Sequence, residues 1–108
     1  MIGLAAGAMT LLSACQTSPN KAFPTAQTLV HTGNAAIADL PNLERGRRIF
    51  ATRCTECHVA RAIAGHTVEQ WRDVVGIMAP RAGLQPDDRA ALEAYLIAAR
   101  QSLPQTGL

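Results

Sequence analysis

The chain has 108 residues, and its ten basic and eight acidic side chains leave a formal net charge of +2. Such a modest charge gives no support to nucleic-acid binding, which usually depends on a strongly basic patch. Two phenylalanines, one tryptophan and one tyrosine are few aromatic residues for a cofactor-free domain of this size. Length and composition therefore predict one small domain with a marginal side-chain core.

Residues 1–14 are almost entirely apolar or small, and they are too short to span a bilayer as a mature helix. We interpret them as an export signal. The run Leu12-Ser13-Ala14-Cys15 resembles a bacterial lipobox, which implies that Cys15 becomes a lipidated N-terminus. The alternative is a cysteine near an ordinary cleavage site. Gln16 rather than Asp follows, which in Gram-negative lipoproteins usually means sorting to the outer membrane.

Residues 16–40 are rich in Thr, Ala, Asn, Ser and Pro and show no sustained apolar periodicity. We expect them to form a flexible tether, with a root-mean-square reach of about 25–30 Å by the coil estimate. Residues 28–31 have some apolar character, but nothing in the sequence requires them to pack. The predicted organisation is a signal peptide at 1–14, a lipidated N-terminus and tether at 15–40, a folded domain at 41–103 and a tail at 104–108.

From Pro41 onward, apolar or small residues recur at helical spacing, and arginines lie between them. The first set is Leu43, Gly46, Ile49 and Phe50, and the second is Arg45, Arg47, Arg48 and Arg53. This pattern predicts an amphipathic helix that runs from Pro41 into Cys54. The arginines would form a basic face, which we interpret as solvated surface in preference to a docking surface.

The pentapeptide Cys54-Thr55-Glu56-Cys57-His58 follows this helix, and a Cys-x-x-Cys-His run is the attachment signal of a c-type haem. Two thiols at this spacing can each form a thioether with a vinyl group of one porphyrin, while the adjacent imidazole reaches the iron. A zinc site would need two more ligands at comparable spacing, and a thioredoxin-like dithiol would need a βαβ context. The motif therefore predicts one covalent haem c, bound by Cys54 and Cys57, with His58 as an iron ligand.

A second helix is predicted after Thr67, because Thr67 and Gln70 form a Thr-x-x-Gln capping box. Its apolar face would carry Trp71, Val74, Val75 and Met78. Pro80 and Gly83 are expected to end it.

A third helix is predicted from Pro86, where a proline and two following aspartates favour a helix start. Its buried stripe would be Leu92, Tyr95, Leu96 and Ala99. Arg100 lies near its C-terminal end, and Pro104 stops it. No strand pattern competes, so the fold class is all-α, with three helices around the covalently attached haem.

Together, these features resemble a class I mono-haem cytochrome c domain over residues 43–100. In that family, a glycine in the first helix lets the last helix cross closely, and aromatic residues pack at the contact. Gly46, Phe50 and Tyr95 match those positions. A weaker likeness is to compact haem domains that partner, or are fused to, bacterial dehydrogenases.

The resemblance implies that a methionine before the last helix supplies the sixth iron ligand, and Met78 is the natural choice. The alternatives are that Met78 fills the core beside Trp71, that His66 or His31 binds instead, or that the iron has an open site. Only nineteen residues separate His58 from Met78. Trp71 is open to two interpretations, a core residue or an indole donor to a haem propionate.

The predicted function is single-electron transfer by a lipid-anchored cytochrome on the periplasmic side of a bacterial membrane. It would not itself be an enzyme, and its partners would be redox proteins: a dehydrogenase-type donor and an oxidase or reductase. The first alternative is a haem enzyme or gas sensor with an open distal site. The second is a redox or metal-binding structural lipoprotein without haem. With Cys15 acylated and the other two cysteines bonded to porphyrin, no free thiol would remain.

Overall fold

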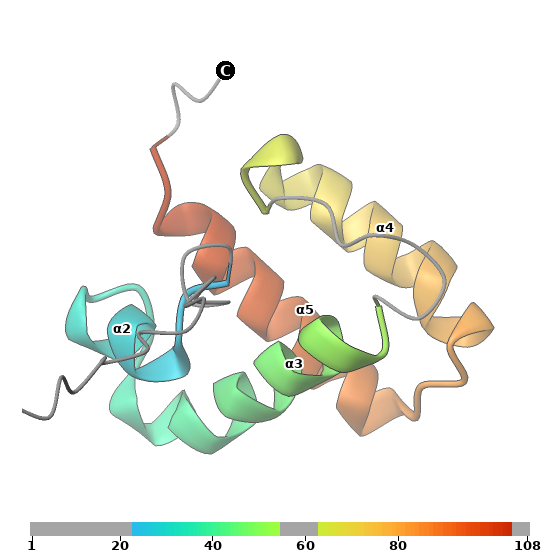
Figure 1. The fold of residues 1–108 in the computed structure, drawn as a ribbon, viewed down its shortest axis with the longest axis horizontal. Coiled ribbons are helices and arrows are strands. Elements are labelled where there is room, and N and C mark those ends of the chain that lie inside the picture. The colour runs from blue at the N-terminus through green and yellow to red at the C-terminus, as the bar shows by residue number, and fades with distance from the viewer. Residues whose placement is uncertain (1–22, 55–62, 105–108) are drawn as a thin grey trace, which may run out of the picture.

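The computed structural model describes residues 23–54 and 63–104, and the regular structure in these two stretches is entirely helical. The α-helices are α2 (Ala26–His31), α3 (Leu40–Thr52), α4 (Val68–Arg81) and α5 (Pro86–Gln101). Two short 3-10 turns, η1 (Ile37–Asp39) and η2 (Ile63–Gly65), precede α3 and α4. Helix α5 packs against both α3 and α4 (Figure 1). The all-α class is confirmed, but the described residues contain four helices where three were expected.

Helix α4 begins as the sequence predicts and ends slightly later. Thr67 Oγ1 accepts a hydrogen bond from the Gln70 amide at 3.1 Å, and Gln70 Oε1 accepts one from the Thr67 amide at 2.9 Å. The helix then continues through Pro80 to Arg81, so the expectation that Pro80 breaks it is wrong. It ends at the next turn, where Gly83 takes a φ of +68° that favours glycine.

Helices α3 and α5 cross at Gly46, where the two backbones nearly touch. A Cβ atom on Gly46 would lie 2.1 Å from the carbonyl oxygen of Ala91 and 2.7 Å from Cβ of Tyr95. Phe50, one turn further along α3, has its ring centroid 6.5 Å from that of Tyr95. The close crossing with aromatic packing, expected from the resemblance, is therefore present.

Residues 23–40 are folded against the domain, which corrects the predicted tether for this part of the chain. Ala26 and Leu29 of α2 are buried in the core, with Leu29 completely inaccessible. The Tyr95 hydroxyl donates to the Pro24 carbonyl at 2.8 Å, and Arg47 Nε donates to the Phe23 carbonyl at 3.2 Å. The polar composition of this segment predicted a tether. The contacts that hold the segment are made with residues far along the chain, and the local sequence gives no sign of them.

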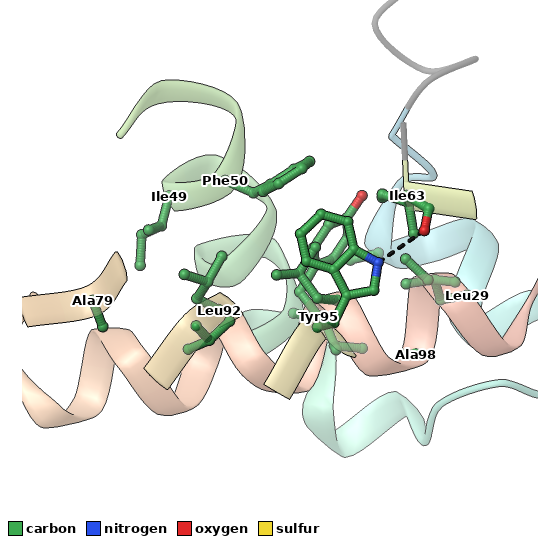
Figure 2. Packing of buried hydrophobic residues seen from close by; sticks show 14 residues of the cluster. Leu29, Ile49, Phe50, Ile63, Ala79, Leu92, Tyr95 and Ala98 are labelled. Atoms are coloured by element: carbon green, nitrogen blue, oxygen red, sulfur yellow. Dashed lines mark hydrogen bonds between the residues drawn. The ribbon is translucent and has the colours of Figure 1, made fainter. Parts of the chain in front are cut away.

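One continuous hydrophobic cluster joins all four helices (Figure 2). Its members are Ala26, Leu29, Leu43, Ile49, Phe50, Ile63, Trp71, Val75, Ala79, Leu92, Tyr95, Leu96, Ala98 and Ala99. The expected stripe of α5 is confirmed, since all four of its residues belong to the cluster. Figure 2 shows Ile49 and Ala79 at one end of the cluster and Leu29 and Ile63 at the other.

Candidate haem-binding site

Cys54 lies directly after the C-terminus of α3, at the edge of the core. Its amide donates to the Ile49 carbonyl at 3.3 Å, and its half-buried side chain packs against the hydrophobic cluster. Burial raises the pKa of the Cys54 thiol, and the positive charge of Arg53 opposes this only in part. The thiol is therefore held protonated beside an apolar surface.

The remaining residues of the predicted attachment site lie outside the described residues. This applies to Cys57 and His58 and also to Cys15, the predicted lipidation site. Their assignments remain predictions from the motif.

Met78 lies in the C-terminal part of α4 and is half-buried. The buried side chains of this helix are Trp71, Val75 and Ala79, with exposed fractions of 2–3 %. Val74 is partly buried and packs against the cluster, but Met78 is not among the described residues that pack against it. The interpretation of Met78 as core filling is therefore unsupported, because Ala79 takes that place on the buried face.

The structure brings the Cys54 end of α3 to the Met78 end of α4. Arg53, adjacent to Cys54, donates a hydrogen bond from Nη2 to the Ala82 carbonyl. The Ala82 amide in turn donates to the Met78 carbonyl at 2.9 Å, closing the last turn of α4. The Cys54 thiol and the Met78 thioether are thus carried by two helix ends that the Arg53–Ala82 hydrogen bond joins.

The two rival histidines lie elsewhere. His31 is exposed at the end of α2, whereas His66 follows η2 and is half-buried. The ring of His66 stands edge-on to the indole of Trp71, with centroids 4.8 Å apart at 83°. His66 thus packs on Trp71 in the N-terminal half of α4, whereas Met78 lies in the C-terminal part of that helix.

The indole of Trp71 is part of the core. It is 3 % exposed, and its N–H donates to the Ile63 carbonyl at 2.8 Å, drawn as the dashed line in Figure 2. Its ring also stands perpendicular to that of Phe50, with centroids 5.7 Å apart. Because the indole donor is already used, this structure favours the core interpretation over a hydrogen bond to a propionate.

Three of the four arginines on the predicted basic face make contacts with other elements. Arg45 pairs with Asp88 of α5 at 2.5 Å, Arg47 bonds the Phe23 carbonyl, and Arg53 bonds the Ala82 carbonyl. Arg48 is exposed. The interpretation as solvated surface holds in part, because Arg45, Arg48 and Arg53 are exposed. Arg45, Arg47 and Arg53 nevertheless also connect α3 to three neighbouring segments.

Sequence reasoning missed Arg100, which it treated only as a favourable charge at the end of α5. The structure buries this residue to 6 % exposure, and its Nε donates to the His66 carbonyl at 2.7 Å. A signal was present in the sequence, because Arg100 lies four residues after Leu96 and so falls on the buried stripe.

Comparison with known protein families, with curated proteins and with solved structures finds no match to this chain. Among residues 23–54 and 63–104, no helix combines the length and apolar character needed to cross a bilayer.

Within the described residues, the Cys54 thiol packs against the apolar core, and the half-buried Met78 thioether lies on the neighbouring helix end. Both are residue types that can serve a haem, one as an attachment point and the other as an iron ligand. Two members of the core cluster adjoin these residues: Ile49, whose carbonyl accepts from the Cys54 amide, and Ala79, the next residue after Met78.

Proposed function

We propose that this protein is a mono-haem c-type cytochrome that carries single electrons and is not itself an enzyme. The observation that carries the proposal is the Cys-x-x-Cys-His run in the sequence, whose first residue, Cys54, follows a helix in which Gly46 lies against the last helix. Support comes from Met78, the thioether on the helix end that is hydrogen-bonded to the Cys54 end of α3.

The proposed roles follow from the chemistry of each side chain. Cys54 and Cys57 would hold the porphyrin through thioethers, and His58 and Met78 would be the axial ligands of the iron. The haem would supply reversible one-electron chemistry at its iron. A methionine sulfur favours ferrous iron relative to a second imidazole, so Met78 would place the potential on the high side. The apolar core beside Cys54 would exclude water from that edge of the group.

The cellular setting is also part of the proposal. A lipid on Cys15 would anchor the protein to the periplasmic side of a bacterial membrane, the outer membrane in a Gram-negative host. Because the folded part begins by Phe23, the connection from Cys15 spans at most about 30 Å even when fully extended. The domain would therefore stay close to the membrane, where it would pass electrons from a dehydrogenase-type donor to a downstream acceptor.

The deciding experiment is an absorption spectrum of the full-length protein expressed with a cytochrome c maturation system. One covalent haem, low-spin and six-coordinate, is expected. A five-coordinate high-spin haem would instead favour the enzyme or gas sensor, and a protein with no Soret band would contradict the cytochrome. Cys54→Ala with Cys57→Ala is the matched loss variant, and it should give mostly unfolded protein without haem. A stable helical domain from that double variant would show that haem is not needed to complete the core.

The anchor is tested separately by mass spectrometry of the mature N-terminus. Lipid on Cys15 is expected, and Cys15→Ser with a soluble export signal should release a periplasmic protein with an unchanged haem spectrum. A triacylated cysteine contributes about 0.8 kcal/mol per buried CH₂, enough for stable attachment. An unmodified residue after cleavage elsewhere would remove the lipoprotein assignment and leave the cytochrome assignment intact.

A further inference from the structure

The end of α4 that carries Met78 is weak as an isolated helix. Met78 lies between Gly76 and Pro80. Glycine loses more conformational entropy than alanine when it enters a helix, and proline has no amide N–H, so the Gly76 carbonyl receives no hydrogen bond from position 80. The helix by itself therefore gives little support to the backbone at Met78, and contacts from outside α4 gain importance there.

The hydrogen bonds at the end of α4 show where such a contact is made. The Met78 carbonyl accepts from the Ala82 amide at 2.9 Å, a bond within the last turn. The Ala82 carbonyl in turn accepts from Nη2 of Arg53, which lies 29 positions earlier in the chain. Carbonyl groups at the C-terminus of a helix lack partners within it, and a cation near them interacts favourably with the helix dipole. Arg53 supplies both a donor and a positive charge.

The backbone of Arg53 is itself held by the end of α3. Its amide donates to the Ile49 carbonyl at 2.7 Å, and the same carbonyl accepts from the Cys54 amide at 3.3 Å. Ile49 belongs to the buried core cluster, so this helix end is attached to the packed part of the domain. The Arg53 side chain thus extends from a fixed position directly before Cys54 to the end of α4.

Helices α3 and α4 are joined mainly through a third helix. Each packs against α5, whereas few of their described residues approach each other directly. The rings of Phe50 and Trp71 do meet, with centroids 5.7 Å apart, but Trp71 lies near the start of α4. The hydrogen bond between Arg53 and Ala82 joins the two helices at the opposite end of α4, one turn after Met78.

We propose that Arg53 is a positioning residue, which holds the Met78 end of α4 in a fixed place relative to Cys54. This geometric role concerns protein atoms alone. Its consequence for the ligand rests on the proposed function: with a haem attached at Cys54, Arg53 would keep the Met78 sulfur in place as a ligand of the iron. Arginine suits this role, because its long side chain stays charged and its planar group directs hydrogen bonds.

Hydrogen exchange of the purified full-length protein tests the geometric role independently of haem. In Arg53→Ala, the amides of Ala82 and Leu84 should exchange about fivefold faster than in the wild type, because the last turn of α4 opens more often. The Leu96 amide of α5 should be unchanged, which separates local opening from global destabilisation. Arg81→Gln is the matched control, since it removes an exposed cation from the same helix end, and its effect should stay below about twofold.

Imidazole competition tests the consequence for the ligand. Imidazole displaces methionine from ferric haem and abolishes the near-infrared band of methionine ligation. Half-displacement in Arg53→Ala should need about fivefold less imidazole than in the wild type, because the Met78 end of α4 is held less firmly. Arg53→Lys keeps the charge without the planar group and should fall between the two. Arg81→Gln should match the wild type.

The outcomes separate this inference from the proposed function. Faster exchange confined to the end of α4, together with easier displacement of Met78, supports the inference. Unchanged exchange in Arg53→Ala overturns it, whatever the haem spectrum shows. Faster exchange with unchanged imidazole displacement overturns the role of Arg53 in ligation. A protein without a Soret band overturns the proposed function, and hydrogen exchange then decides the geometric role by itself.

Discussion

The helix crossing at Gly46 and the sulfur-bearing end of the molecule differ in how completely side chains pack them. At the crossing, Ala91 and Tyr95 are fully buried, and backbone meets backbone with no room for a methyl group. At the other end, Cys54 and Met78 are only half-buried. The helix crossing is therefore fully packed by the protein itself, whereas the end that carries Cys54 and Met78 is only partly buried.

This difference separates the region that holds the helices together from the region that carries the two sulfur atoms. A close-packed crossing fixes the angle between α3 and α5, and with it the place where the Cys54 end of α3 lies. The less packed end carries the two half-buried sulfur atoms of Cys54 and Met78, at which the proposed haem would be held. Substitutions in each of the two regions test this comparison, with the free energy of unfolding and the absorption spectrum as the measured quantities.

The largest effect is expected from Gly46→Ala. The added methyl would overlap the Ala91 carbonyl, so α3 and α5 must separate, at a cost of about 3 kcal/mol in unfolding free energy. Gly76→Ala is the matched control, because its Cβ would meet only the Arg89 side chain at 3.6 Å. An alanine there should stabilise α4 by about 0.5–1 kcal/mol. Equal results for the two variants in urea unfolding would contradict the close crossing.

Leu29→Ala tests whether residues 23–40 belong to the packed region. Leu29 is completely buried against the core, so we expect a loss of about 2–4 kcal/mol. Ile37, at 74 % exposure, offers a control within the same segment, and Ile37→Ala should change stability by less than about 0.5 kcal/mol. If Leu29→Ala were equally silent, the tether predicted from composition would be right after all.

Tyr95→Phe should have a smaller effect that depends on pH. At neutral pH, losing the hydrogen bond to the Pro24 carbonyl costs about 1 kcal/mol. Burial raises the pKa of the Tyr95 phenol well above its usual range, against the lowering influence of Arg47. The folded state therefore holds this proton after the unfolded chain releases it, and the contribution of Tyr95 is full below about pH 10 and falls as pH rises further. The wild type should lose its advantage over Tyr95→Phe above that pH in parallel denaturation scans, and a constant difference would contradict the raised pKa.

Met78→Leu should have the smallest effect on stability, within about 1 kcal/mol, since the swap nearly conserves volume at a half-buried site. Its spectroscopic effect should be complete, with loss of the weak near-infrared band of methionine-ligated ferric haem. His66→Ala should keep that band. A band that survives in Met78→Leu would transfer the ligand assignment away from Met78 and make His66 the next residue to test.

Much of the helical framework could be predicted locally. The capping box at Thr67 and the start of α5 at Pro86 depend on hydrogen bonds and dihedral angles within one turn, and both appear as expected. The extent of α4 could be predicted less well, because a proline near a helix end removes one hydrogen bond without forcing the backbone out of the helix.

The sequence by itself determined the all-α class and the register of α3 and α5, because hydrophobic periodicity encodes both, and it contains the Cys-x-x-Cys-His run on which the proposed haem depends. Only the tertiary structure decided that Leu29 is core, that Ala79 replaces Met78 on the buried face, and that Arg100 is buried without a full set of partners. The contacts responsible join residues as far apart as Pro24 and Tyr95. The physical reason is that burial is a property of the assembled helices, so a polar segment or a charged residue can be enclosed by neighbours that local sequence does not specify.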